Sequence, residues 1–306
     1  MFLGVLLTAC QSNPGPKDKE LTLAITQVAP GVYSAIGATK PPSYENRGHN
    51  NNLSFIVTSA GVLVVNGGDN YLLAEALHRE IRRITDQPIR FVVDENGQGH
   101  AFLGNSYWAT QGVPAIALEP AYEEIREQGN AILKRMLARN RERGEHTTVA
   151  VPEICFEASL HLNLGDTPIQ ILTFGPAHSP GDVSVWLPEQ KILIAGDIAF
   201  HQRLLAIFPD TNVAEWLKSF HKMAALQPRI IVPGHGVPTD LATIRTYTYD
   251  YLVYLRDQVN QILEEDGDLS DAYEIDQSAY SDLDTFQELA RKNAGRLYQQ
   301  MEMDSF

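Results

Sequence analysis

Apolar and polar positions alternate along this chain with two spacings, one typical of strands and one typical of helices. Short apolar runs bounded by glycine, proline or polar turns predict buried strands at 53–58, 62–65 and 89–93. Between the second and third runs, Leu73, Leu77 and Ile84 recur at helical spacing and predict a helix over 72–84, which Pro88 stops.

The second half continues with strands and helices and closes with helices alone. Strands are expected at 114–118, 182–187, 191–194 and 229–232, and helices at 102–110, 122–143 and 213–226. From Leu241 onward the pattern is helical, with a break at Gly267. This order predicts an α+β protein in which two sheets pack together between outer helices, a layered αββα arrangement. The loops at one edge of such a sandwich are the expected place for chemistry.

Composition and charge narrow the class of protein. The 306 residues are 44% hydrophobic and 20% charged, which is ordinary for a globular protein. The net charge of −14 argues against a nucleic-acid partner, because no basic stripe is present to neutralise phosphates. We expect a small-molecule substrate; the sequence identifies no protein partner.

The first twenty residues resemble a targeting segment rather than part of a folded domain. Leu7-Thr8-Ala9-Cys10 has the form of a bacterial lipobox after a short apolar run, so we expect lipidation of Cys10. A polar tether follows, and Gln11 favours an outer-membrane anchor facing the periplasm. We therefore assign 1–20 to a signal remnant and tether, 21–240 to the main domain and 241–306 to helices that pack on it. The second cysteine, Cys155, is expected to be a lone thiol buried in a strand.

Three short segments near the ends of expected strands carry potential metal ligands. They are Gly-Pro-Ala-His178, Ala-Gly-Asp197 and Pro-Gly-His235. Imidazole and carboxylate are the side chains that bind zinc in hydrolytic sites. The three segments therefore indicate part of a metal site.

The order and spacing of these segments resemble the metallo-beta-lactamase superfamily. The resemblance runs from about Leu21 to His235 and is most specific in His178-Ser-Pro-Gly-Asp182 and Ile192-Leu-Ile-Ala-Gly-Asp197. It implies the four-layer αββα sandwich, here with a C-terminal helical extension, and zinc as the cofactor. Segments such as Glu45-Asn46-Arg47-Gly48 resemble those of a periplasmic branch of zinc hydrolases that is linked to quinoprotein relay or sulfur-oxidation systems.

The departure from the family lies in its H-x-H-x-D-H loop. In this chain Asn96, Gln98, His100 and Ala101 stand where the family has its two early histidines, its aspartate and its last histidine. The resemblance then implies His100, His178, Asp197 and His235 as metal ligands, with one zinc ion favoured over two and no metal as a remaining alternative. If a zinc ion is held there, Asp197 is expected to orient the bound water or accept its proton, and Asn96 and Gln98 are expected to donate hydrogen bonds to an oxyanion. Asp94 and Glu95 are acidic substitutions in the same loop, and either offers a new carboxylate beside these positions.

Two functions follow from this reading. The first is a mono-zinc hydrolase, anchored as a lipoprotein, that cleaves an ester, lactone, amide or thioester. The second is a catalytically inactive protein of the same fold that binds a ligand or a partner through the cleft where the family has its active site. The ligands that remain favour the first, and the ligands that are lost favour the second.

Overall fold

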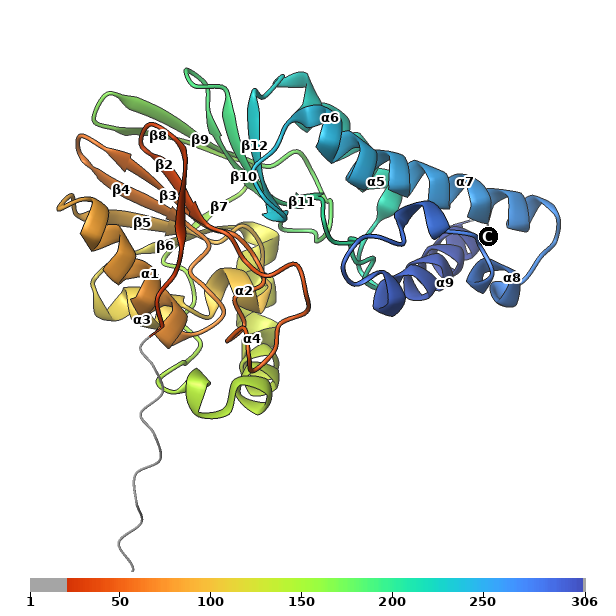
Figure 1. Cartoon of the computed structure of the whole chain (residues 1–306), viewed down its shortest axis with the longest axis horizontal. Helices are drawn as coiled ribbons and strands as arrows, with labels where there is room; N and C mark the ends of the chain where they lie inside the picture. The colour runs from red at the N-terminus through yellow and green to blue at the C-terminus, as the bar shows by residue number, and fades with distance from the viewer. Residues whose placement is uncertain (1–20, 305–306) are drawn as a thin grey trace, which may run out of the picture.

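The apolar runs of the sequence form two β-sheets that face each other in the computed structural model, which describes residues 21–304 (Figure 1). The first sheet has the strand order β1 (Ile25–Ala29), β2 (Val32–Ala35), β3 (Leu53–Thr58), β4 (Gly61–Val65), β5 (Ile89–Val93), β6 (Ala115–Leu118) and β7 (Ile154–Phe156). The second has the order β12 (Ile230–His235), β11 (Ile192–Phe200), β10 (Ser184–Leu187), β9 (Thr167–Leu172) and β8 (Ser159–Leu164). Pairing is antiparallel from β1 to β4 and from β8 to β11, and parallel for β4 to β7 and for β11 with β12.

Both faces of the central strands are apolar because each face meets a different layer. In β4, Leu63 and Val65 point into the core between the sheets, while Val62 and Val64 point to the helices outside. Successive side chains of a strand point to opposite faces, so an unbroken apolar run is what a strand buried on both sides requires. β11 repeats this arrangement on the second sheet.

Helices cover the two outer faces. α1 (Tyr71–Ile84) and α3 (Asn105–Thr110) pack on the first sheet, and α5 (Val213–Ala225) packs on the second. Asn70 caps α1 by accepting a hydrogen bond from the Leu73 amide. The αββα sandwich predicted from the sequence is therefore confirmed, and the helix predicted over 72–84 forms over 71–84.

Two further helices lie near the loop edge of the sandwich. α2 (Gly99–Phe102) follows the loop after β5, and α4 (Glu119–Asn140) packs against it through Ile125, Ile132 and Met136. The short helix η1 (Arg141–Gly144) extends α4. This pair forms one wall of the site described below.

The C-terminal helices lie at one side of the sandwich, away from α1 and α3 (Figure 1). They are α6 (Leu241–Ile244), η2 (Arg245–Tyr249), α7 (Asp250–Glu264), α8 (Leu269–Tyr273), η3 (Ser278–Tyr280) and α9 (Phe286–Asp304). The predicted break at Gly267 falls between α7 and α8. Leu255 of α7 and Leu297 of α9 share one buried cluster with Trp216 of α5, so these helices pack on the second sheet's outer layer.

Cys155 is exposed, and the prediction that it is buried was wrong. β7 is the edge strand of the first sheet, and Ile154 and Phe156 turn inward to the core between the sheets. The alternation of side chains therefore directs Cys155 outward. Cys10 lies outside the described residues. Among residues 21–304, none of the helices has the length and apolar character needed to cross a bilayer.

Candidate metal centre

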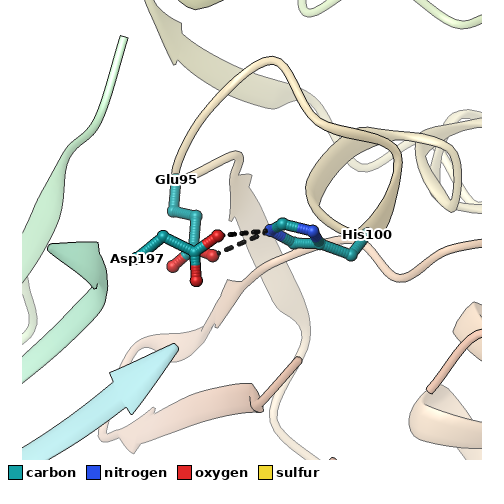
Figure 2. A group of neighbouring side chains, drawn as sticks. All are labelled: Glu95, His100 and Asp197. Atoms are coloured by element: carbon teal, nitrogen blue, oxygen red, sulfur yellow. Dashed lines mark hydrogen bonds and ion pairs between the residues drawn. The ribbon is translucent and has the colours of Figure 1, made fainter. Parts of the chain in front are cut away.

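Three side chains from separate segments meet at the loop edge of the sandwich. Glu95 lies in the loop after β5, His100 lies in α2, and Asp197 lies in the middle of β11. They offer ligand atoms that all lie within 4.8 Å of one another, and Figure 2 shows the two carboxylates facing the His100 ring. His100 Nε2 is 3.0 Å from Glu95 Oε1 and 3.5 Å from Asp197 Oδ2. We call these three residues the cation cluster.

The other two predicted ligands also approach Asp197. His235, at the end of β12, has its Nε2 3.4 Å from Asp197 Oδ1. His178, in the loop before β10, has its Nε2 3.8 Å from Asp197 Oδ2. Aromatic rings hold both imidazoles: His235 stacks on Phe200, and His178 packs against Phe200 and Trp216. The structure thus brings the three predicted histidine ligands around the carboxylate of the fourth, Asp197.

An asparagine beneath the cluster holds the two carboxylates together. Asn51 donates through Nδ2 to Glu95 Oε1 at 2.9 Å and to Asp197 Oδ1 at 3.1 Å. Asn66 in turn donates to Asn51 Oδ1 at 2.9 Å, which fixes the orientation of the Asn51 amide. Asn66 itself has φ 69°, a left-handed conformation that asparagine tolerates better than most residues. Asn51 was not predicted from the sequence; the available signal was the run Asn50-Asn51-Asn52 directly before a buried strand.

Burial determines the ionisation of this site. Desolvation and the neighbouring Glu95 carboxylate raise the pKa of Asp197 to about 8, and desolvation raises the pKa of Glu95 to about 7. Desolvation lowers the pKa of His100, lowers that of His178 to about 3 and places that of His235 well below its usual range. The imidazoles are therefore neutral, which is the form that binds metal ions.

Two carboxylate oxygens of the cluster lack hydrogen-bond partners in the described part of the chain. They are Glu95 Oε2 and Asp197 Oδ2, and both side chains are 1% exposed. A buried carboxylate without compensation is costly, and binding a cation is one of the ways proteins compensate it. Carboxylate oxygens beside neutral imidazoles are a donor set that divalent metal ions accept. The residues present therefore fit a metal ion.

The remaining predicted site residues have different positions. Gln98 lines the cavity beside the cluster. Asn96 is fully buried, donates through Nδ2 to Asp182 Oδ1 at 3.2 Å and accepts from the Gln98 amide, and it is not among the cavity-lining residues. The structure thus brings Gln98 to the cavity and uses Asn96 to support the loop.

The cavity in front of the cluster has a volume of about 390 Å³, which is within the range of small-molecule pockets. One wall is α4, which contributes Gln128, Ile132 and Arg135. The opposite wall carries Arg203 and Phe208 from the segment after β11. The cavity is therefore partly apolar and carries charges of both signs, and His100 and Asp197 of the cluster lie in its lining.

Comparison with known proteins gives the same family as the motifs. The family model described as the metallo-beta-lactamase superfamily matches residues 104–235, which include His178, Asp197 and His235. The chain is 25% identical over 226 residues to a type 2 metallo-beta-lactamase of Bacteroides fragilis, covering 70% of this chain and 79% of that protein. It is 22% identical over 238 residues to a linear primary-alkylsulfatase of a Pseudomonas species, covering 65% of this chain and 44% of the alkylsulfatase.

A solved structure shares the fold. The metallo-beta-lactamase from Pontibacter korlensis superposes with a TM-score of 0.61 at 17% identity, covering 76% of this chain and 99% of that one. The motifs, the family model over residues 104–235 and the shared fold agree: this part of the chain matches the metallo-beta-lactamase superfamily, and the chain has the fold of a metallo-beta-lactamase.

Proposed function

We propose that this chain is a hydrolase that uses one divalent cation, zinc in the first instance, to cleave an ester, lactone, amide or thioester bond of a small molecule. The observation that carries this proposal is the convergence of His100, His178 and His235 around Asp197, beside a carboxylate oxygen that has no hydrogen-bond partner among the described residues. When bound, the cation supplies Lewis acidity towards a substrate carbonyl and lowers the pKa of a water molecule.

The residues of the chain supply the rest of the chemistry. His100, Asp197 and His235 would hold the cation, and His178 serves as a fourth ligand or as a neighbouring proton carrier. Asp197 orients the attacking water and accepts its proton. Gln98, on the cavity wall, is placed to donate a hydrogen bond to a developing oxyanion. Asn51 keeps the Asp197 carboxylate oriented during this step.

Metal content and hydrolysis together test the proposal. Purified protein exposed to zinc and then desalted should retain about one equivalent, and a panel of esters, lactones and thioesters should reveal a chelator-sensitive activity. His235→Ala should lower both metal content and activity at least about tenfold, because a ligand is lost. The matched control is His221→Ala, an exposed histidine on α5 whose ring pairs with Tyr249 and which does not line the cavity. Retention of less than about a tenth of an equivalent by the unaltered protein contradicts the proposal.

The second candidate is a ligand-binding protein without catalysis. It is supported by the positions of Asn96, Gln98 and Ala101 in the loop where the family has histidines, and by the use of the Asn96 amide to hold Asp182. If this candidate holds, His235→Ala leaves the cellular phenotype intact. Loss of the phenotype together with loss of hydrolysis rules it out.

We also propose that Cys10 carries a lipid anchor that holds the chain at the outer membrane, facing the periplasm. The support is the Leu7-Thr8-Ala9-Cys10 motif and Gln11 after it. Metabolic labelling with a palmitate analogue tests it: Cys10→Ala should abolish the label, and persistence of the label contradicts the assignment.

A further inference from the structure

The Glu95 carboxylate occupies a defined position in the site, although the family resemblance assigns it no role. The loop is held from both sides: the Glu95 amide donates to Asn66 Oδ1 at 3.3 Å, and the Val183 amide donates to the Glu95 carbonyl at 2.8 Å. Its neighbour Asp94 points elsewhere and accepts from Asn105. The backbone therefore directs Glu95, and not Asp94, towards the cluster.

Gly196 makes room for this carboxylate. A Cβ atom built on Gly196 would overlap Glu95 Oε2, and Gly196 has φ +67°, which a side chain would disfavour. Asp197 follows directly in β11. The glycine thus allows the carboxylates of Glu95 and Asp197 to lie next to each other at the end of the sandwich.

The two carboxylates share one neutral donor, and neither forms an ion pair with a lysine or arginine in the described part of the chain; the charge of Arg203 acts on Asp197 from a longer range. Within residues 21–304, the ion-pair partner of Glu95 is His100 alone, and Asp197 pairs with histidines only. One oxygen of each carboxylate has no hydrogen-bond partner in that same range. Two buried carboxylates in this arrangement repel each other, and a divalent cation between them removes the repulsion.

We propose that Glu95 is a direct ligand of the bound cation and forms, with His100 and Asp197, a single-cation site rich in oxygen donors. This inference rests on the proposed function and deepens it, because it names the ligand set of the same site. Glu95 then replaces the donors that the loop loses at Asn96, Gln98 and Ala101. Since carboxylate oxygens suit Mn²⁺ better than a set of imidazoles does, Mn²⁺ binding should depend on Glu95 more strongly than Zn²⁺ binding does.

The experiment compares metal binding by the unaltered protein, Glu95→Gln and Asp94→Asn. Mn²⁺ binding is measured from the loss of the free-ion electron paramagnetic resonance signal, Zn²⁺ binding by calorimetry, and the ligand field of bound Co²⁺ by visible absorption. Glu95→Gln should weaken Mn²⁺ binding at least about 100-fold, weaken Zn²⁺ binding less, and change the Co²⁺ spectrum, because one ligand has been removed.

Asp94→Asn is the matched control. Asp94 is an adjacent, fully buried carboxylate outside the cluster, and an asparagine there can keep a hydrogen bond to the Asn105 amide. We expect a change in affinity of less than about threefold and an unchanged Co²⁺ spectrum, because Asp94 contributes no ligand atom to the cluster and the replacement keeps the hydrogen bond to Asn105. Glu95→Asp, which keeps the charge but withdraws the oxygens, should weaken binding and change the spectrum. It supplies the test if Glu95→Gln does not fold.

The outcomes separate this inference from the proposed function. Cation binding that does not depend on Glu95 overturns the inference alone, as does weakened binding with an unchanged Co²⁺ spectrum, which would indicate a purely electrostatic effect. Glu95-dependent binding without any hydrolysis overturns the proposed function alone. Failure of the unaltered protein to bind any of the three ions overturns both.

Discussion

Asn293 connects the C-terminal helices to the wall of the cavity, and its replacement should destabilise the protein strongly. Its side chain, on α9, is fully buried. It accepts a hydrogen bond from the Ile207 amide at 2.9 Å and donates to the Leu205 carbonyl at 2.8 Å and to the Tyr251 hydroxyl at 3.0 Å. The segment it holds also carries Arg203 and Phe208, which line the cavity.

The magnitude follows from the groups that Asn293→Ala leaves behind. The Ile207 amide and the Leu205 carbonyl are backbone groups of fully buried residues, and each costs about 1–3 kcal/mol when left unpaired. The Tyr251 hydroxyl still donates to Gln277 and adds little. We therefore expect a loss of about 2–6 kcal/mol in the free energy of unfolding, a large part of the stability of a typical domain.

Urea unfolding followed by tryptophan fluorescence and far-ultraviolet circular dichroism measures this loss. The control is Gln299→Ala, an exposed position on the same helix, which should change stability by less than about 0.5 kcal/mol. The cation cluster lies outside the segment from Leu205 to Ile207, so a folded Asn293→Ala protein should keep its Co²⁺ affinity. A loss of less than about 1 kcal/mol, with an unchanged denaturant slope, would refute the reasoning.

Three further predictions concern the surroundings of the site. Burial lowers the pKa of His49 to about 4, below its unfolded value of about 6.5, so its stabilising contribution is present above pH 6.5 and is lost as the pH falls towards 4. Between about pH 7.5 and pH 5, the free energy of unfolding from urea denaturation should therefore fall by about 2 kcal/mol more in the unaltered protein than in His49→Gln. Equal decreases in the two proteins would contradict this. Gly234→Ala should weaken Co²⁺ binding at least about tenfold, because the new Cβ would overlap Asp197 Oδ1, whereas Gly112→Ala, which meets no atom within 4 Å, should not; equal affinities exclude the packing argument. The Arg203 guanidinium lies in the cavity beside His235, so we expect it to bind the carboxylate of an anionic ligand. The unaltered Co²⁺-loaded protein should then bind 3-mercaptopropionate about tenfold more tightly than 2-mercaptoethanol, and Arg203→Met should remove this preference. An unchanged preference would exclude the anion-binding role.

The loop after β5 shows a feature that the sequence did not predict, namely which of its side chains points into the site. Glu95 and Asn96 are adjacent polar residues after the same strand, and periodicity gives no rule for a loop. The backbone path sends Glu95 to His100 and Asn96 to Asp182. Only the packed positions of β5, α2 and the His178 loop decide this difference.

The sequence by itself determined the layers and most of the site. Unbroken apolar strands such as 62–65 require burial on both faces, and the leucine spacing of 72–84 requires a helix on one of them. The motifs around His178, Asp197 and His235 occur in the order and spacing that the family resemblance describes, so their meeting was predictable. Tertiary structure alone decided the role of Asn51, whose hydrogen-bond partners Glu95 and Asp197 lie 44 and 146 positions further along the chain. It also decided the outward orientation of Cys155 on an edge strand. The physical reason is that periodicity reports which face of an element is buried, whereas contacts between loops depend on how complete elements pack.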